Sequence, residues 1–257
     1  MNNINEDPIP ETTILSKLSK HAATTPQKTA VTFLTPGANG GTPSKTFTYS
    51  RVESLTSSIA THLLSSPKCP GFKRGDRVVL VFPPSPDFMM AFLACLKAGA
   101  IAVPVFPPAP HRRDSVAAFS KIVEGCGATI ALTNKEYGHA KKLAGLKGAV
   151  TRGKSQWPDG LKWIVTDDIS SDDDDAAAAS FRPVLHPVAF LQYTSGSTSL
   201  PKGVAITHAN LRHNLEIISS SLGASTETVV VSWLPQYHDM GLIGSYLGVL
   251  YNGGSGD

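Results

Sequence analysis

Cysteine, net charge and long apolar runs are all scarce in this sequence. Its three cysteines, Cys69, Cys95 and Cys126, form neither a CxxC metal-binding pair nor an even set for disulfides, which favours a reducing compartment. The net charge is only +3, and no basic stripe alternates with aromatic residues, which argues against a nucleic-acid partner. The strongest apolar run, residues 88–96, is far shorter than the ~20 residues of a membrane-spanning helix. The N-terminus also lacks the apolar stretch of a signal peptide. These absences predict a cytoplasmic protein with no transmembrane segment.

The composition that remains is that of a folded domain. Apolar residues make up 41% of the 257 residues, which is enough for a buried core. Charged residues make up 17%, below the roughly 25% that is usual in soluble domains, so intrinsic disorder is not expected. The length allows one large domain or two small ones, because domains run to roughly 100–200 residues.

Strand-like and helix-like segments alternate along the chain. Residues 77–82 form an apolar run without polar alternation, as in a strand that is buried on both faces. The next segment, 85–98, is apolar on every side, with Pro86 at its start and Gly99 after its end, which predicts a buried helix. Further helices are expected at 13–23, behind a Ser50–Glu53 capping box, from 114 or 115, and at 135–146; further strands are expected at 29–34, 45–49, 101–105, 128–132, 161–165 and 187–193. Connections of this length imply parallel pairing, so the expected fold class is α/β, with doubly wound, largely parallel sheets and flanking helices.

The segment 167–180 breaks this alternation, because it is rich in aspartate and then in alanine. A metal site of paired carboxylates is conceivable there. A surface loop is the favoured interpretation, because a run of like charges repels itself and nothing nearby supplies a scaffold. We therefore assign no metal-binding residue.

The first stretch with chemical content is TSGSTSLPKG at residues 194–203. Strand-like runs flank it, so it is expected to join two strands. Its hydroxyls and backbone N–H groups can donate to phosphate oxygens, and Gly196 permits the positive φ that turns N–H groups inward. Lys202 adds a mobile positive charge. Such a loop suits a polyphosphate.

Three other interpretations of this loop are weaker. It is not a Walker P-loop, because Pro201 stands where glycine is required and no helix follows at once. An ordinary Ser/Gly-rich hairpin would explain the hydroxyls, but not the ordered Pro-Lys-Gly behind them. Ser199 and Lys202 formally match the Ser-x-x-Lys of serine acylases, but β-branched residues follow instead of a helix, and the companion triplets are missing.

The second stretch is WLPQYHDMG at residues 233–241. A strand-like run, 228–232, precedes it, which places it at the carboxyl edge of a sheet, where ligands bind in open α/β folds. His238 can donate to an oxyanion or to a substrate carboxylate. Taken alone, a histidine beside Asp239 is more typical of a capped turn with a satisfied imidazole. A metal phosphohydrolase of the HD type would need further ligands, and no convincing set is present.

Together the two stretches resemble a known family. YTSGSTSLPKGV at 193–204 and SWLPQYHDMGLIG at 232–244 resemble the adenylate-forming superfamily of acyl-CoA synthetases, firefly-type luciferases and peptide-synthetase adenylation domains. The segments 21–31, 72–108 and 127–133 are similar to its N-terminal part, so the resemblance spans nearly the whole chain. WLPQYHDMGLIG and FPPAP at 106–110 resemble most closely the fatty acyl-AMP ligases and the related disco-interacting protein 2 modules. Ser199 departs from the glycine usual in the superfamily.

The resemblance implies adenylation: a fatty acid and ATP, with Mg²⁺, give acyl-adenylate and pyrophosphate. In the acyl-AMP ligase branch the acyl group then passes to the phosphopantetheine thiol of an acyl carrier protein. The residues that match the phosphate-binding loop are Thr194, Ser195, Gly196, Ser197, Thr198, Lys202 and Gly203. His238 matches the residue that meets the substrate carboxylate and the α-phosphate, so we predict His238 and Lys202 as catalytic residues.

The family's later motifs lie beyond residue 257, as does its small C-terminal domain. We therefore expect residues 1–257 to form an incomplete N-terminal AMP-binding domain that is inactive, or nearly so, by itself. Two alternatives stay open: an acyl-CoA synthetase of the same superfamily, or a non-catalytic remnant that binds nucleotide phosphates.

Overall fold

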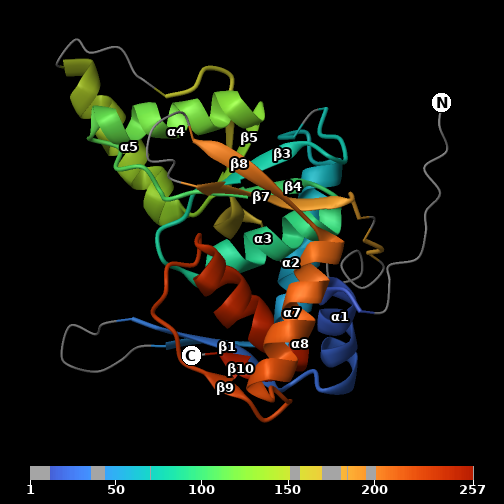
Figure 1. Cartoon of the computed structure of the whole chain (residues 1–257). Coiled ribbons are helices and arrows are strands. Elements are labelled where there is room, and N and C mark those ends of the chain that lie inside the picture. Colours follow the sequence, from blue (N-terminus) through green and yellow to red (C-terminus); the bar gives the residue numbers. More distant parts are fainter. Residues whose placement is uncertain are drawn as a thin grey trace, which may run out of the picture.

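The computed structural model describes residues 12–35, 44–69, 71–150, 157–169, 181–183, 185–194 and 201–256, apart from the side chains of 147–150. They form two sheets with helices packed between them (Figure 1). The helices are α1 (Ile14–Thr24), α2 (Tyr49–Ser65), α3 (Pro86–Ala98), α4 (Arg113–Cys126), α5 (Lys135–Val150), α7 (His208–Leu222), α8 (Gly248–Asn252), the 3₁₀-helix η1 (Thr166–Asp168) and the π-helix η2 (Met240–Leu247). The strands are β1 (Thr29–Leu34), β2 (Ser44–Thr48), β3 (Arg77–Leu80), β4 (Ile101–Pro104), β5 (Ile130–Thr133), β6 (Lys162–Val165), β7 (Val188–Thr194), β8 (Lys202–Thr207), β9 (Val229–Val230) and β10 (Ser255–Gly256).

The larger sheet has six strands in the order β6-β5-β3-β4-β7-β8. All neighbours are parallel except β7 and β8, which form an antiparallel pair at one edge. The smaller sheet has the order β2-β1-β10-β9 and is parallel except for the β1–β2 pair. The predicted α/β class with largely parallel sheets and flanking helices is confirmed.

Both faces of the six-stranded sheet are covered by helices. Val78 and Leu80 of β3 face the larger core, which contains α2 and α3 and reaches the smaller sheet. Val79 and Val81 point the other way, towards α4 and the start of α5. This alternation follows from the two-residue period of a strand, and it explains why β3 is apolar at every position after Arg77.

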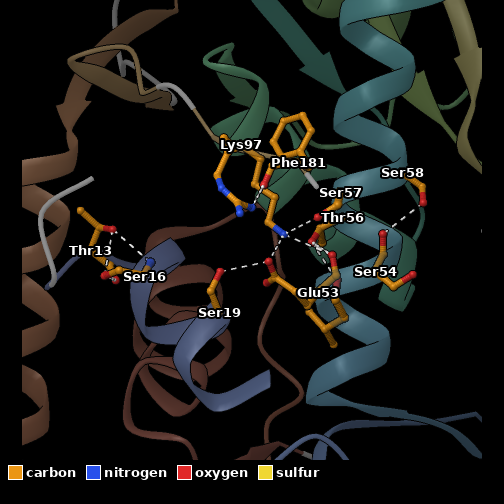
Figure 2. Close-up of polar contacts among 12 residues, drawn as sticks. Thr13, Ser16, Ser19, Glu53, Ser54, Thr56, Ser57, Ser58, Lys97 and Phe181 are labelled. Atoms are coloured by element: carbon orange, nitrogen blue, oxygen red, sulfur yellow. Dashed lines mark hydrogen bonds and ion pairs between the residues drawn. The ribbon is translucent and has the colours of Figure 1, made fainter. Parts of the chain in front are cut away.

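Helix α3 is buried along almost its entire length, as its apolar sequence predicts. Pro86 occupies its first turn, and Gly99 ends it in the left-handed conformation at φ 71°. Lys97 is buried as well, and Figure 2 shows its side chain reaching Glu53 and Ser57 of α2. No described helix has both the length and the apolar character needed to cross a membrane.

Some local expectations are corrected. The cap of α2 is Thr48, whose hydroxyl accepts the N–H of Arg51 at 3.3 Å, so the Ser50–Glu53 capping box is wrong. Ser85, a residue type that favours the N-cap position, precedes α3, but its side chain makes no capping hydrogen bond. The extended segment at 228–232 pairs only at Val229–Val230.

Strand β9 is the edge of the smaller sheet. An exposed apolar strip begins on it and continues along the chain that follows. Val229, Val231 and Trp233 are 59%, 65% and 88% exposed, whereas Val230 between the two valines is half-buried against the core. The strip therefore has the two-residue period of an extended chain.

Candidate functional site

The predicted phosphate loop begins and ends on the β7–β8 hairpin. Thr194 pairs with Lys202, and both side chains are exposed at the loop end of the hairpin. The expectation that the loop joins two strands is therefore confirmed. Ser195, Gly196, Ser197 and Thr198 lie outside the described residues, so their part in the site stays a prediction.

Gly203 has a packing role at the base of the loop. It pairs with Tyr193 across the hairpin, and a Cβ placed on it would lie 3.1 Å from two carbons of the tyrosine ring. Burial, and after it the nearby thiol of Cys126 in α4, raises the pKa of the Tyr193 hydroxyl. Packing over a glycine fixes the register of the two strands just before the loop.

The turn that carries His238 is tightly folded. The backbone N–H of His238 donates to the carbonyl of Pro235 at 3.0 Å, and the N–H of Leu242 donates to the carbonyl of His238 at 2.8 Å. Gly241 packs directly on Pro235, because a Cβ there would overlap the carbonyl oxygen. The backbone on both sides of the imidazole is thus fixed.

Three neighbouring strands hold this turn in place at their carboxyl ends. Beyond β3, the carbonyl of Pro83 accepts the side-chain amide of Gln236 at 3.2 Å. Beyond β4, the ring of Phe106 packs edge-on against Tyr237 with centroids 5.3 Å apart. From β7, the side-chain amide of Gln192 donates to the carbonyl of Tyr237 at 3.3 Å. The turn therefore lies at the carboxyl edge of the six-stranded sheet.

Sequence reasoning missed these supporting residues. Gln192 had one signal, because it is the single polar residue in the apolar run of β7 before Tyr193. Phe106 was noted only as part of a family resemblance. No local sequence pattern marks Gln236, which is 3% exposed. Its burial depends on its hydrogen bond to the carbonyl of Pro83, which is far away in sequence.

His238 and Asp239 form a contact pair. Nδ1 of His238 lies 2.7 Å from Oδ1 of Asp239, and the same oxygen accepts the N–H of Met240 at 2.8 Å. The hydrogen bond from His238 lowers the pKa of the Asp239 carboxyl. Both side chains are open to solvent, at 68% and 59% exposed, so Nε2 of His238 remains free to meet a ligand.

The loop base and the turn open on one pocket of about 620 Å³. Thr194 and Gln192 line it from β7, Asp239 and Met240 line it from the turn, and α7 forms a further wall. Its apolar lining includes Phe190, Val204, Ile206 and Ile243. The two stretches singled out in the sequence are therefore brought together in space.

The described residues do not form a magnesium site. Across the part of the chain that the structure describes, no three His, Cys, Asp or Glu side chains gather as metal ligands. Asp239 is the acidic residue on the pocket, and its Oδ1 is already engaged by His238 and Met240.

Comparisons with known proteins agree with this geometry. A family model described as AMP-binding enzyme matches residues 18–256. The chain is 31% identical over 218 residues to the medium-chain-fatty-acid–[acyl-carrier-protein] ligase JamA of Moorena producens, a match that covers 84% of this chain and 34% of that protein. It is 36% identical over 211 residues to the ligase TtuA of Teredinibacter turnerae, named for the same activity, covering 69% of this chain and 32% of that protein.

A solved structure is also similar. The fatty acyl-adenylate ligase from L. pneumophila, in complex with acyl adenylate and pyrophosphate, superposes with a TM-score of 0.77 at 33% identity, covering 95% of this chain and 39% of that one. The chain belongs to the family of AMP-binding enzymes. It spans about a third of the length of JamA and TtuA, and the resemblance to the adenylate-forming superfamily is confirmed.

Proposed function

We propose that this chain forms the front part of a fatty acyl-AMP ligase. Such an enzyme joins a fatty acid to ATP, releases pyrophosphate, and passes the acyl group to the phosphopantetheine thiol of an acyl carrier protein. The observation that carries the proposal is the shared pocket, on which Thr194 of the phosphate loop and Asp239 beside His238 both open. The names of JamA, TtuA and the L. pneumophila ligase support the choice of substrate and acceptor.

Charge neutralisation is the main chemical task of this site. A carboxylate that attacks the α-phosphate brings two anions together, so alignment and opposing charge lower the barrier. Lys202, at the loop end of the hairpin, would offset the negative charge of the β- and γ-phosphates as they leave. His238 would hold the carboxylate and the α-phosphate through its free Nε2, since Nδ1 is occupied by Asp239.

The apolar lining of the pocket suits an acyl chain. Val204, Ile206, Met240 and Ile243 offer surface on which methylene groups can be removed from water, at about 0.8 kcal/mol each. We propose that the acid lies along these side chains, with its carboxylate at the Asp239 end. The cytoplasm is the compartment we propose, since all three cysteines are free and buried.

Binding by the chain itself is the first test. We expect it to bind ATP, with an affinity that falls about tenfold in Lys202→Ala, because a charge-assisted contact to phosphate is worth about 1.5–3 kcal/mol. Lys68→Ala, which removes another exposed lysine, is the matched control. Equal ATP affinity in Lys202→Ala and the parent chain would refute the role of the loop.

Turnover is the second test. We expect fatty-acid-dependent ATP–pyrophosphate exchange from a polypeptide in which this chain is fused to the remaining part of JamA, and little from the chain alone. His238→Ala should lower that exchange about 100-fold by removing one oxyanion donor, whereas His139→Ala on the exposed side of α5 should not. A fusion that binds ATP but shows no exchange would favour the non-catalytic phosphate-binding alternative. Transfer of the acyl group to CoA instead of the carrier protein would favour the acyl-CoA synthetase.

A further inference from the structure

The contact between His238 and Asp239 determines where the imidazole proton lies. An ionised carboxylate only accepts hydrogen bonds, so the proton in a 2.7 Å contact with it belongs to Nδ1. The same Oδ1 is fixed by the N–H of Met240 at 2.8 Å. The hydrogen bond from His238 lowers the pKa of the Asp239 carboxyl, so this carboxylate is ionised across the neutral range.

Nothing else that is described competes for this ring. The hydrogen bonds that the structure gives to the side chain of His238 are limited, among the described residues, to the one with Asp239. The neighbouring Tyr237 directs its ring towards Phe106. Backbone hydrogen bonds with Pro235 and Leu242 hold the main chain of His238 in place. The Asp239 carboxylate therefore needs to fix only the side-chain torsions of His238.

From this geometry we propose that Asp239 is a positioning residue, which keeps His238 in the tautomer protonated at Nδ1 and so presents Nε2 to the ligand. The chemical use of Nε2 rests on the proposed function, but the tautomer does not. Nε2 accepts a hydrogen bond while the ring is neutral and donates one when the ring is protonated. In the other tautomer, with the proton on Nε2, the lone pair of Nδ1 would face the Asp239 carboxylate and the proton would face the ligand.

A second histidine supplies an internal reference. Nε2 of His21 lies 3.4 Å from the carbonyl oxygen of Tyr251, which can only accept, so His21 carries its proton on Nε2. Burial lowers the pKa of His21, which keeps this ring neutral near pH 7. The two histidines are therefore expected in opposite tautomers within one molecule.

The experiment is ¹H–¹⁵N NMR on the chain labelled with ¹⁵N-histidine, with His238 assigned by its loss in His238→Gln. We expect a protonated Nδ1 and an unprotonated Nε2 for neutral His238, and the reverse for His21. In Asp239→Asn the side-chain amide can donate to Nδ1, so the proton should move to Nε2. In Asp239→Ala the preference for Nδ1 should disappear. Asp114→Asn, an exposed carboxylate on another element, should change nothing at His238.

The ligand arm uses an acyl-sulfamoyl adenosine, a non-reacting analogue of acyl-adenylate. Its addition should shift the Nε2 signal of His238 in the parent chain, and Asp239→Asn should bind it about tenfold more weakly, as for loss of one charge-assisted hydrogen bond. A parent His238 protonated at Nε2, or signals unchanged in Asp239→Asn, overturns the tautomer assignment. Equal affinity of the two proteins overturns the positioning role. If the analogue does not bind the parent chain at all, the proposed function fails, and the spectra still decide the tautomer.

Discussion

The ion pair between Lys97 and Glu53 gives the sharpest prediction about stability, because its two members are buried to different degrees (Figure 2). Nζ of Lys97 lies 2.8 Å from the Glu53 carboxylate, 2.9 Å from the hydroxyl of Ser57 and 3.2 Å from the backbone carbonyl of Glu53. The side chain of Lys97 is 0% exposed, whereas that of Glu53 is 28% exposed. When its partner is removed, Lys97 is left fully buried, whereas Glu53 is partly exposed and still accepts the hydroxyl of Ser19 at 3.0 Å.

This difference sets the expected magnitudes. Glu53→Gln leaves an ammonium group without a counter-charge in the core, which should lower the free energy of unfolding by about 3–5 kcal/mol. Lys97→Met leaves a carboxylate that is partly exposed and keeps the Ser19 hydroxyl as a donor, so the loss should be smaller, at about 2 kcal/mol. The double variant removes both charges and should be more stable than Glu53→Gln alone. Burial lowers the pKa of Lys97 below its ordinary 10.5, so the unfolded Glu53→Gln chain binds more protons than the folded one, and its deficit should shrink as pH rises towards 10.5.

Urea unfolding at pH 7 measures these differences, with the slope of each transition checked for equality. Asp168→Asn is the matched control, since its contact with Lys135 is more than half exposed and should contribute less than about 1 kcal/mol. The reasoning would be refuted if Lys97→Met cost as much as Glu53→Gln, or if the two losses simply added in the double variant.

Three shorter predictions concern other contacts. Burial lowers the pKa of His208 to about 4 from 6.5, so between these pH values the unfolded chain binds one more proton than the folded chain. The free energy of unfolding should therefore fall by about 3 kcal/mol from pH 6.5 to pH 4. Urea unfolding at a series of pH values measures this loss, which should be much smaller in His208→Gln. Gly241→Ala should distort the turn by overlap with Pro235 and cost about 2 kcal/mol or more, whereas Gly244→Ala, with open space around it, should cost less than about 1 kcal/mol in the same melts. Tyr49→Phe removes a buried hydroxyl that donates at 2.7 Å to the backbone carbonyl before β10, and calorimetry should show a loss of about 1–3 kcal/mol.

Features encoded by neighbouring residues could be predicted from the sequence. Helix α3 is predictable because its sequence is apolar on every side and because Pro86 marks its start and Gly99 its end. The hairpin around the phosphate loop is predictable because an apolar run precedes the loop and a β-branched run follows it. Helix α7 was missed although Thr207 and Asn210 form a capping box, because only Leu211 and Leu215 along it are buried. So few buried positions give little periodicity.

Features that depend on distant pairing could not be predicted. Strand β10 is two residues long and exists because it lies between β1 and β9, strands far from it in sequence. The supports of the His238 turn depend in the same way on β3, β4 and β7 being neighbours in the sheet. Local patterns identified the candidate residues, and the strand order brought them together.

The strip on β9 has a consequence for handling the protein. Val229, Val231 and Trp233 lie in a row along β9 and the chain that follows it, and no described strand pairs with the outer side of β9. The protein therefore carries an exposed apolar edge of the kind that associates with other chains. A preparation at high concentration should self-associate through this edge, and a charged substitution such as Val231→Lys should keep it monodisperse without changing the lining of the pocket between Thr194 and Asp239.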